Sequence, residues 1–499
     1  MASDTAIARS MCQGEADASC PRHLRKYVLG VAVLGSSLGF IDGTIITVAV
    51  QPIREGLGAS FAAVQWVVNG YTLTLAAFLL IGGAAGDRFG KRRVFAAGIT
   101  LFAVASVACA MAPSVEALIV ARLVQGLGAA MMVPASLALI AVNYSAEERG
   151  RAVGIWAAAS GITSALGPIL GGLLIDLGSW RWVFIINVPI AALTLAILFA
   201  RVPADEPQEG GRFDVPGGIL AFLAVGAVAL GFTLAERAGL TAPLPIIFVA
   251  AGVALAALFV AWQARATTPM LPLAMFASRT FSVANAETLL VYFALGGILF
   301  FLPITMMEAH GWSATEAGAV FLPFTLTMAV VSPIAGRLAD RIGARVLLIV
   351  GPLIVAAAFA ALGILAGDAD TIVDIAPAMM AFGVGMGLAI PPLSSAILND
   401  VGSERSGVAS GVNNAVARVA GLLAIAVLGL VASLVYQAAT GTTSGFAGPV
   451  EGDAEARSAA ITHTFLVLTA TAATLCVAAS GLALLLPRLR EAAADASPA

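Results

Sequence analysis

Two short stretches of the chain repeat one another. Residues Gly83 to Arg93 read G-A-A-G-D-R-F-G-K-R-R, and residues Gly336 to Arg345 read G-R-L-A-D-R-I-G-A-R. The shared positions stand at identical offsets and are Gly83, Asp87, Arg88 and Gly90 in the first stretch, and Gly336, Asp340, Arg341 and Gly343 in the second. Any short basic loop could contain such residues once, but two copies in register indicate two homologous halves.

Both stretches are predicted to be loops between helices. Glycine permits a tight turn, and aspartate can cap the start of a helix. The basic residues that follow, Arg92 among them, are typical of a loop that anchors the cytoplasmic face of a membrane protein.

The composition predicts that the chain lies in a membrane. Of its 499 residues, 60% are hydrophobic and 11% are charged, against about 25% charged in soluble domains. Mean hydropathy is +0.97. A water-soluble fold of this size needs far more polar surface. The composition therefore excludes a soluble globular protein, a disordered chain and a nucleic-acid-binding protein, and it predicts a polytopic protein whose surroundings are the lipid bilayer.

Cysteine and histidine give no sign of a metal or cofactor site. The four cysteines show no C-x-x-C spacing, and the three histidines are scattered. The sequence also lacks a phosphate-binding Gly-Lys-Ser loop and an H-E-x-x-H motif. No metal, cofactor or enzymatic activity is predicted.

Fourteen segments are long and apolar enough to cross a bilayer as helices, for which about 20 residues are needed. They cover approximately residues 27–50, 62–82, 94–112, 115–142, 152–176, 181–200, 216–235, 244–262, 281–306, 315–336, 345–366, 374–397, 408–437 and 460–486. Each repeated stretch follows the second helix of a six-helix block, so helices 7 and 8 are predicted to be inserted between two repeats. The predicted parts are a cytoplasmic N-terminal tail (1–26), a six-helix bundle (27–200), a linker with two inserted helices (201–280), a second six-helix bundle (281–486) and a cytoplasmic C-terminal tail (487–499).

Basic residues favour one orientation. With a cytoplasmic N-terminus, 20 of the 26 Lys and Arg residues fall on the inner side and four on the outer side, as the positive-inside rule requires. Both termini are therefore expected on the cytoplasmic side of the cell (inner) membrane.

Four further stretches carry a family resemblance. They are I-D-G-T-I-I-T-V-A-V-Q-P-I from Ile41, A-R-L-V-Q-G-L-G-A-A from Ala121, G-I-T-S-A-L-G-P-I-L-G-G from Gly161 and W-R-W-V-F-I-I-N-V-P from Trp180. Together with the repeated stretches, they resemble motifs of the major facilitator superfamily, specifically its fourteen-helix drug:proton antiporter branch.

The resemblance implies an all-α major facilitator fold and a monomeric, proton-coupled exporter of lipophilic drugs, cationic ones included. Such an antiporter works by alternating access, exchanges protons for small lipophilic substrates and confers multidrug efflux and antibiotic resistance. One alternative is an exporter of one endogenous metabolite, antibiotic or lipid on the same fold. A membrane channel or enzyme is a more remote alternative. The antiporter motif would comprise Gly161, Gly167, Pro168, Gly171 and Gly172.

Charged side chains within the predicted spans mark candidate functional sites, because a charge near the bilayer centre costs at least ~2.5 kcal/mol. Asp42 and Arg122 are both expected roughly 20 Å from the inner face, at about 1.5 Å per helical residue. We therefore predict that they interact. Pairing with Arg122 stabilises the carboxylate of Asp42, and separation lets Asp42 take a proton. The alternative is a static structural ion pair.

The second half offers Glu287 and Arg418 within its spans. Arg418 belongs to the stretch V-N-N-A-V-A-R-V-A-G, which resembles another motif of the branch. Glu287 is interpreted as a second protonation site, a contact for a cationic substrate or an interfacial acid. Three further acids, Asp176, Glu236 and Glu308, are expected to be interfacial because they fall near the outer ends of spans.

Helix 5 is predicted to act through its backbone, by close packing at glycines and by a kink at proline. Gly167 and Gly171 form a small-x-x-x-small pair that permits close helix packing. Pro168 frees a backbone carbonyl and is expected to kink the helix, which would then flex or seal the interface between the halves.

Overall fold

The computed structural model describes residues 22–203, 205, 213–401, 406–442, 445–450 and 454–487. Most of the two predicted tails lies outside these residues. The helices of the first half are α2 (Arg22–Leu57), α3 (Phe61–Phe89), α4 (Lys91–Ala110), α5 (Val115–Asn143), α6 (Ala146–Leu177), the short α7 (Trp182–Ile185) and α8 (Asn187–Arg201). Then follow α9 (Val215–Ala238), α10 (Pro243–Gln263) and the 3-10 turn η1 (Leu273–Ala277). The remaining helices are α11 (Arg279–His310), α12 (Ala314–Ala319), α13 (Leu322–Ile342), α14 (Ala344–Leu365), α15 (Ile372–Val401), α16 (Ser406–Thr440) and α17 (Ala454–Ala483).

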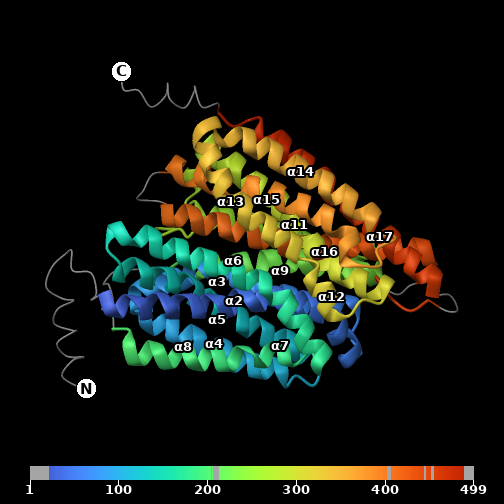
Figure 1. The fold of residues 1–499 in the computed structure, drawn as a ribbon, viewed down its shortest axis with the longest axis horizontal. Helices are drawn as coiled ribbons and strands as arrows, with labels where there is room; N and C mark the ends of the chain where they lie inside the picture. The colour runs from blue at the N-terminus through green and yellow to red at the C-terminus, as the bar shows by residue number, and fades with distance from the viewer. Residues whose placement is uncertain are drawn as a thin grey trace. The chain divides into compact units, whose positions relative to one another are not determined.

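Fourteen helical segments within the described residues are long and apolar enough to cross a membrane, which confirms the predicted number. The sixth and tenth spans each combine a short helix with a longer one, α7 with α8 and α12 with α13. Among the described residues all regular elements are helical (Figure 1).

Contacts between Cα atoms divide the chain into two compact units. Unit 1 runs up to Pro52 and includes Trp66–Phe222 and Ala266–Met270. Unit 2 consists of Ile53–Gln65, Leu223–Arg265 and the chain from Leu271 onward. In unit 1, α4 packs along α5 and α8; in unit 2, α14 packs along α15 and α17.

The two repeated stretches are almost entirely helical, which differs from the loops expected from the sequence. Helix α3 continues to Phe89 and α4 begins at Lys91, so only Gly90 lies between them. Likewise, only Gly343 separates α13 from α14. Both glycines have positive φ, +92° and +89°. Because glycine adopts such angles without strain, one residue is enough to turn the chain between two helices.

The same internal repeat governs helix packing. Gly98 follows Gly90 by the same eight residues as Gly351 follows Gly343. A Cβ atom on Gly98 would lie 2.9 Å from the carbonyl oxygen of Gly128 on α5, and one on Gly351 would lie 2.9 Å from that of Gly385 on α15. In each half, therefore, the third and fourth spans touch backbone to backbone, and no larger residue fits at the contact.

Arginines at matching positions fasten each half to its last helix. Arg92 Nη2 donates to the carbonyl oxygen of Phe199 at the end of α8, at 3.2 Å. Arg345 Nη2 donates to that of Leu484, just beyond α17, at 2.7 Å. A helix leaves its last carbonyls without intrahelical partners and carries negative potential there. The basic residues of the repeated stretches thus stabilise helix ends within their own half.

Candidate functional site

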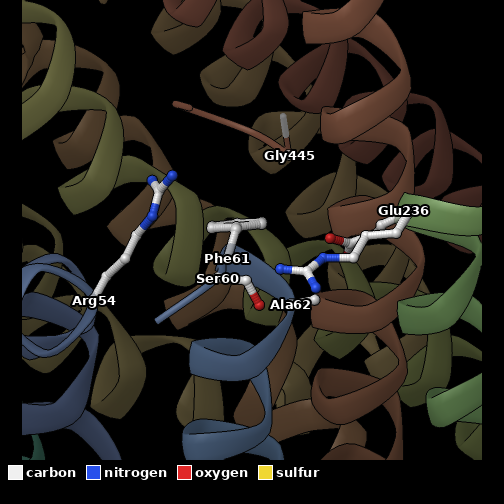
Figure 2. A pocket seen from close by; sticks show the side chains of 7 residues that line it. Arg54, Ser60, Phe61, Ala62, Glu236 and Gly445 are labelled. Atoms are coloured by element: carbon white, nitrogen blue, oxygen red, sulfur yellow. The ribbon is translucent and has the colours of Figure 1, made fainter. Parts of the chain in front are cut away.

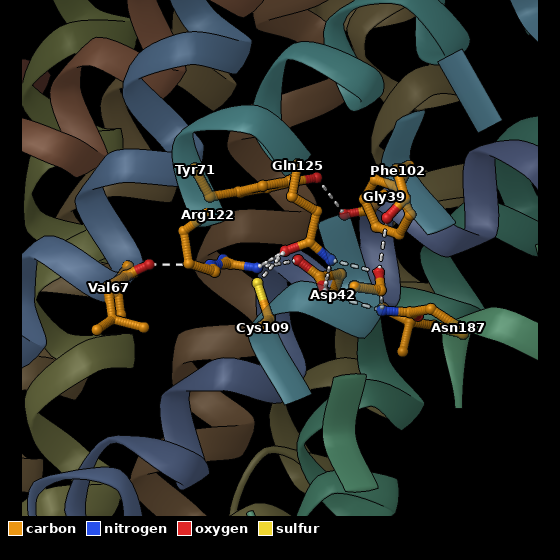
Figure 3. A network of polar contacts seen from close by, with 12 residues as sticks. Gly39, Asp42, Val67, Tyr71, Phe102, Cys109, Arg122, Gln125 and Asn187 are labelled. Carbon is orange, nitrogen blue, oxygen red and sulfur yellow. Dashed lines mark hydrogen bonds and ion pairs between the residues drawn. The ribbon is translucent and has the colours of Figure 1, made fainter. Parts of the chain in front are cut away.

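Asp42 and Arg122 form a buried ion pair in unit 1 (Figure 3). Asp42 Oδ2 accepts from Arg122 Nη1, and both side chains are 0% exposed. Asp42 lies on α2 and Arg122 on α5. The equal depth estimated from the sequence therefore corresponds to direct contact between these two residues.

Neutral donors complete the surroundings of the Asp42 carboxylate. Its Oδ1 atom accepts from Gln125 Nε2 at 2.8 Å and from Asn187 Nδ2 at 3.0 Å. Gln125 Nε2 and Asn187 Nδ2 also contact the hydroxyl oxygen of Ser106, at 2.9 Å and 3.4 Å. Gln125, Asn187 and Ser106 are all 0% exposed. With three donors on its two oxygens, the site fits an ionised carboxylate.

Arg122 is held from several sides. Its Nε donates to the carbonyl oxygen of Val67 at 2.9 Å, and its Nη1 donates to Gln125 Oε1 at 2.7 Å. The guanidinium carbon lies 4.4 Å from the ring centroid of Tyr71, within cation–π range. Nη2 forms no hydrogen bond within the described part of the chain. Moving Arg122 away from Asp42 therefore breaks contacts with α3 and α5 together.

Gln125, Asn187 and Ser106 were missed as site residues by the sequence analysis. Gln125 stands three residues after Arg122 in the quoted stretch of α5, and Asn187 lies in the stretch from Trp180. A polar side chain in an apolar span usually faces the bundle interior. That signal was present, but the approach of α4 and α8 to Asp42 depends on tertiary packing.

Glu287 and Arg418 do not pair with each other in the described structure. Glu287 is 0% exposed, and neither of its oxygens has a hydrogen-bond partner among the described residues. The next residue, Thr288, accepts from Asn413 Nδ2 of α16 at 2.7 Å. The Cβ atom of an alanine at Gly296 would lie 2.7 Å from Gly421 Cα. Glu287 thus sits on a helix in close contact with α16, inside unit 2.

Helix α6 packs against α2 through its glycines. A Cβ atom on Gly167 would lie 2.1 Å from Thr44 Oγ1, and one on Gly171 would lie 2.6 Å from Ile45 Cγ1. Gly172 and Pro168 are also buried, whereas Gly161 is exposed and has open space beside it. Because Pro168 has no N–H, the carbonyl of Ser164 lacks its helical donor. Thr44 Oγ1 of α2 donates to that carbonyl at 2.8 Å.

The start of α4, in the first repeated stretch, is capped by a residue that no sequence motif marked. Asp205 accepts from the backbone N–H groups of Lys91 and Arg92, the latter at 2.9 Å, and so caps the start of α4. Asp87 instead forms an ion pair with Lys91 at 3.1 Å. In unit 1, the capping expected of the motif aspartate therefore comes from the chain beyond α8. The guanidinium of Arg88 lies 5.5 Å from the ring centroid of Phe89.

The matching positions of unit 2 lie on α13. Gly336 has open space where a Cβ would stand, and Arg341 is in the last turn of the helix. Asp340 and Arg341 are exposed.

Two of the three acids expected to be interfacial have side-chain partners inside unit 2. Glu236 on α9 is 4% exposed and accepts from Gln65 Nε2 at 2.7 Å. Glu308 on α11 forms an ion pair with Arg457 of α17, and its side chain is 7% exposed. Asp176 is exposed. The partners of Glu236 and Glu308 come from helices far away in the chain, so the sequence did not reveal these contacts.

Known proteins resemble the chain along most of its length. The sequence profile described as Major Facilitator Superfamily matches residues 32–425. The Multidrug resistance protein Stp of Mycobacterium tuberculosis (strain CDC 1551 / Oshkosh) is 34% identical over 402 residues, covering 80% of this chain and 74% of Stp. The Tetracenomycin C resistance and export protein of Streptomyces glaucescens is 37% identical over 405 residues, which cover 81% of this chain and 75% of that protein. The Puromycin resistance protein pur8 of Streptomyces alboniger is 33% identical over 475 residues, which cover 93% of this chain and 92% of that protein.

Solved structures share the fold at lower identity. A bacterial homolog to the human lysosomal transporter Spinster, in an inward-facing and unoccupied conformation, matches with a TM-score of 0.64 and 19% identity, over 93% of this chain and 98% of that chain. A D-xylose-proton symporter matches with a TM-score of 0.61 and 16% identity, over 90% of this chain and 96% of that chain. At such identities the similarity concerns the fold alone.

Proposed function

Since the chain belongs to the Major Facilitator Superfamily, we propose that it is a proton-coupled antiporter that exports lipophilic compounds, cationic ones included. It is a multi-pass membrane transporter and not an enzyme. Relatives named for resistance to several drugs, tetracenomycin C and puromycin support an efflux transporter.

The observation that carries the proton coupling is the buried network around Asp42. A charge pair with both partners 0% exposed is expensive to place in a membrane protein, and intramembrane charges commonly mark proton or substrate pathways. Asp42 is a carboxyl whose charge is balanced by one cation, Arg122. That is the minimum needed to link a proton to a conformational change.

The network suggests how the link works. While Arg122 contacts Asp42, the carboxylate is ionised and α2, α3 and α5 are joined through it. When the helices shift and draw Arg122 away, an unpaired buried carboxylate is unfavourable, and Asp42 takes a proton. Release of that proton restores the pair. Protonation of Asp42 and the position of the helices are then coupled in a single conformational equilibrium.

Glu287 supplies a second carboxyl in this proposal. It is fully buried, and no described residue donates to it. In an apolar interior a carboxyl is best tolerated when it is neutral or faces a cation. Glu287 can therefore hold either a proton or a cationic substrate, and competition between the two produces exchange.

The test is uphill transport by purified protein in proteoliposomes with an imposed pH gradient. We expect a lipophilic cationic dye to accumulate against its gradient with wild-type protein. With Asp42→Asn, we expect downhill dye movement to remain and uphill accumulation to be lost. The matched control is Asp374→Asn, which makes the same carboxyl-to-amide change at an exposed residue that contacts Thr371. Uphill transport by Asp42→Asn with unchanged pH dependence would refute the proposed coupling.

A second measurement concerns Glu287. In the Glu287→Gln variant, we expect dye binding to the purified protein to lose its pH dependence, because no carboxyl remains for which proton and dye compete. A neutral lipophilic substrate should bind wild type and variant equally. If cationic and neutral probes respond alike to Glu287→Gln, Glu287 is not the shared site.

We further propose a monomer in the cell membrane with both termini in the cytoplasm. The asymmetric distribution of basic residues supports this orientation. Protease digestion of right-side-out and inverted vesicles, read with an epitope at each terminus, tests it. Both epitopes should be cleaved only in inverted vesicles.

A further inference from the structure

Glu236 is a buried carboxyl that the proposed coupling site does not include. It lies near the C-terminal end of α9, the first of the two helices predicted to be inserted. Gln65 Nε2 donates to its Oε1 at 2.7 Å, and Ser433 Oγ donates to its Oε2 at 3.3 Å. None of the ion pairs formed by the described residues includes Glu236. Its hydrogen-bond partners Gln65 and Ser433 are both neutral, whereas Asp42 also accepts from the cation Arg122.

Helix α16 leaves space for this pair of side chains. A Cβ atom on Gly429 would lie 2.2 Å from Gln65 Nε2 and 2.8 Å from Glu236 Oε1. Any larger residue at this position would push the amide and the carboxyl apart. The contact between Glu236 and Gln65 therefore depends on a glycine from a third helix.

The cluster accommodates Glu236 both with and without a proton. Gln65 is 0% exposed, and its amide oxygen has no hydrogen-bond partner among the described residues. When Glu236 is an ionised carboxylate, it accepts a hydrogen bond from the amide nitrogen of Gln65, as observed. A half-turn of the amide would bring Oε1 to the same place, where it can accept from a protonated Glu236. A protonated Glu236 would thus give the amide oxygen of Gln65 a hydrogen-bond donor.

A cavity gives access to this carboxyl (Figure 2). It has a volume of about 480 Å³. Its lining includes Glu236, Arg54, Arg237, Gly445 and the first residues of α3, numbers 60–62. In Figure 2, Arg54 and Glu236 flank the start of α3. The space is large enough for several waters, so protons can reach Glu236 without unfolding.

The positive charges that line the cavity disfavour an organic cation there. Two guanidinium groups, of Arg54 and Arg237, line the cavity together with the carboxyl of Glu236, while Glu308 and Glu55 also interact electrostatically with Arg54. Arg54 Nη1 is fixed by the carbonyl oxygens of Phe446 and Ala447, at 3.3 Å and 3.2 Å, and Arg237 is exposed. The two guanidinium groups oppose the entry of a lipophilic cation. A proton instead becomes part of a neutral carboxylic acid and needs no counter-charge.

We propose that Glu236 is a proton-binding site, reached through this cavity and separate from Asp42 and Glu287. Ser433 extends the site, because its Oγ also accepts from the backbone N–H of Phe446 at 3.3 Å. The chain segment that carries Phe446 is therefore hydrogen-bonded to the proton site through one hydroxyl. A role of Glu236 in export rests on the proton coupling proposed above, whereas proton binding itself does not.

Infrared difference spectroscopy of the purified full-length protein in lipid nanodiscs tests the proposal without transport. Between alkaline and acidic pH, we expect a protonated-carboxyl C=O band that is lost in Glu236→Gln and kept in Glu55→Gln, a matched change at an exposed glutamate. Identical difference spectra for wild type and Glu236→Gln would overturn the proposal. Should Glu236→Gln fail to fold, Gln65→Leu must displace the band, since it removes the amide partner. An undisplaced band would equally overturn it.

The route is tested by filling the cavity. Ala62→Trp should slow the appearance of the Glu236 band after a pH jump several-fold and leave its final size unchanged, and an unchanged rate would overturn the proposed route. Failure of this inference is distinct from failure of the proposed function. Uphill transport that depends on Asp42, without a Glu236 band, overturns only the present inference. A Glu236 band in a protein whose transport ignores the pH gradient overturns only the coupling.

Discussion

Gly90 and Gly343 adopt nearly the same backbone conformation at matching points of the two halves. Their φ and ψ angles are +92° and 130° for Gly90, and +89° and 147° for Gly343. Each is the single residue between two spanning helices. The two halves therefore share a backbone conformation at this point as well as a sequence motif. Each half depends on one residue that must tolerate positive φ.

The first prediction concerns this dependence. We expect Gly90→Ala and Gly343→Ala each to lower the free energy of unfolding by about 1–3 kcal/mol, because a side chain is strained in this region of φ and ψ. Thermal unfolding of the purified variants measures the loss. The matched control is Gly86→Ala, since Gly86 is helical and its Cβ would meet Lys91 Cγ at an ordinary 3.8 Å. Equal stability of Gly90→Ala and Gly86→Ala would contradict the prediction.

The second prediction concerns Asp205, which caps α4 by accepting from the N–H groups of Lys91 and Arg92. Asp205→Ala should cost about 1 kcal/mol of stability, the usual cost of losing a helix N-cap. Asp205→Asn serves as its control, because asparagine keeps the acceptor oxygen. Faster hydrogen–deuterium exchange at the two amides in the alanine variant alone would identify the mechanism. The same exchange in both variants would show that charge, not capping, matters.

These two sites show how far the sequence could predict the fold. Hydropathy predicted all fourteen spans because each is a long apolar run. It could not predict that α3 continues through Asp87 to Phe89, because the loss of hydrophobicity marks the bilayer edge and not the helix end. Asp205 was missed because it lies more than 100 residues beyond Lys91, in a linker without a motif.

The candidate site was predictable to a similar extent. Asp42 and Arg122 are conspicuous as charges in apolar runs, and helical rise alone gave them equal depth. The donors from Gln125 and Asn187 depend on how the helices approach each other, which no single sequence states. For Glu236, the relevant neighbours come from α3 and α16, so its position near a span end could not predict its hydrogen-bond partners.

The third prediction concerns the hydrogen bond between Thr44 Oγ1 and the Ser164 carbonyl that Pro168 leaves without a donor. Thr44→Val should cost roughly 0.6–1.7 kcal/mol, the range for hydrogen bonds between membrane helices. In a Pro168→Ala background the cost should shrink, because the alanine N–H can donate to Ser164. A double-mutant cycle of thermal stabilities measures this coupling. Thr47→Val is the control, since Thr47 donates to a carbonyl of its own helix. An equal cost of Thr44→Val in both backgrounds would argue against the role assigned to Pro168.

The last prediction concerns the energetics of the Asp42–Arg122 pair. Arg122→Gln leaves a buried carboxylate without its cation and should cost about 3–5 kcal/mol. Adding Asp42→Asn removes that charge and should recover most of the loss, because the amide can still accept from Gln125 and Asn187 through its oxygen. Thermal unfolding of the single and double variants provides the comparison. A double variant no more stable than Arg122→Gln would mean that packing of the guanidinium against Tyr71, and not the charge on Asp42, dominates.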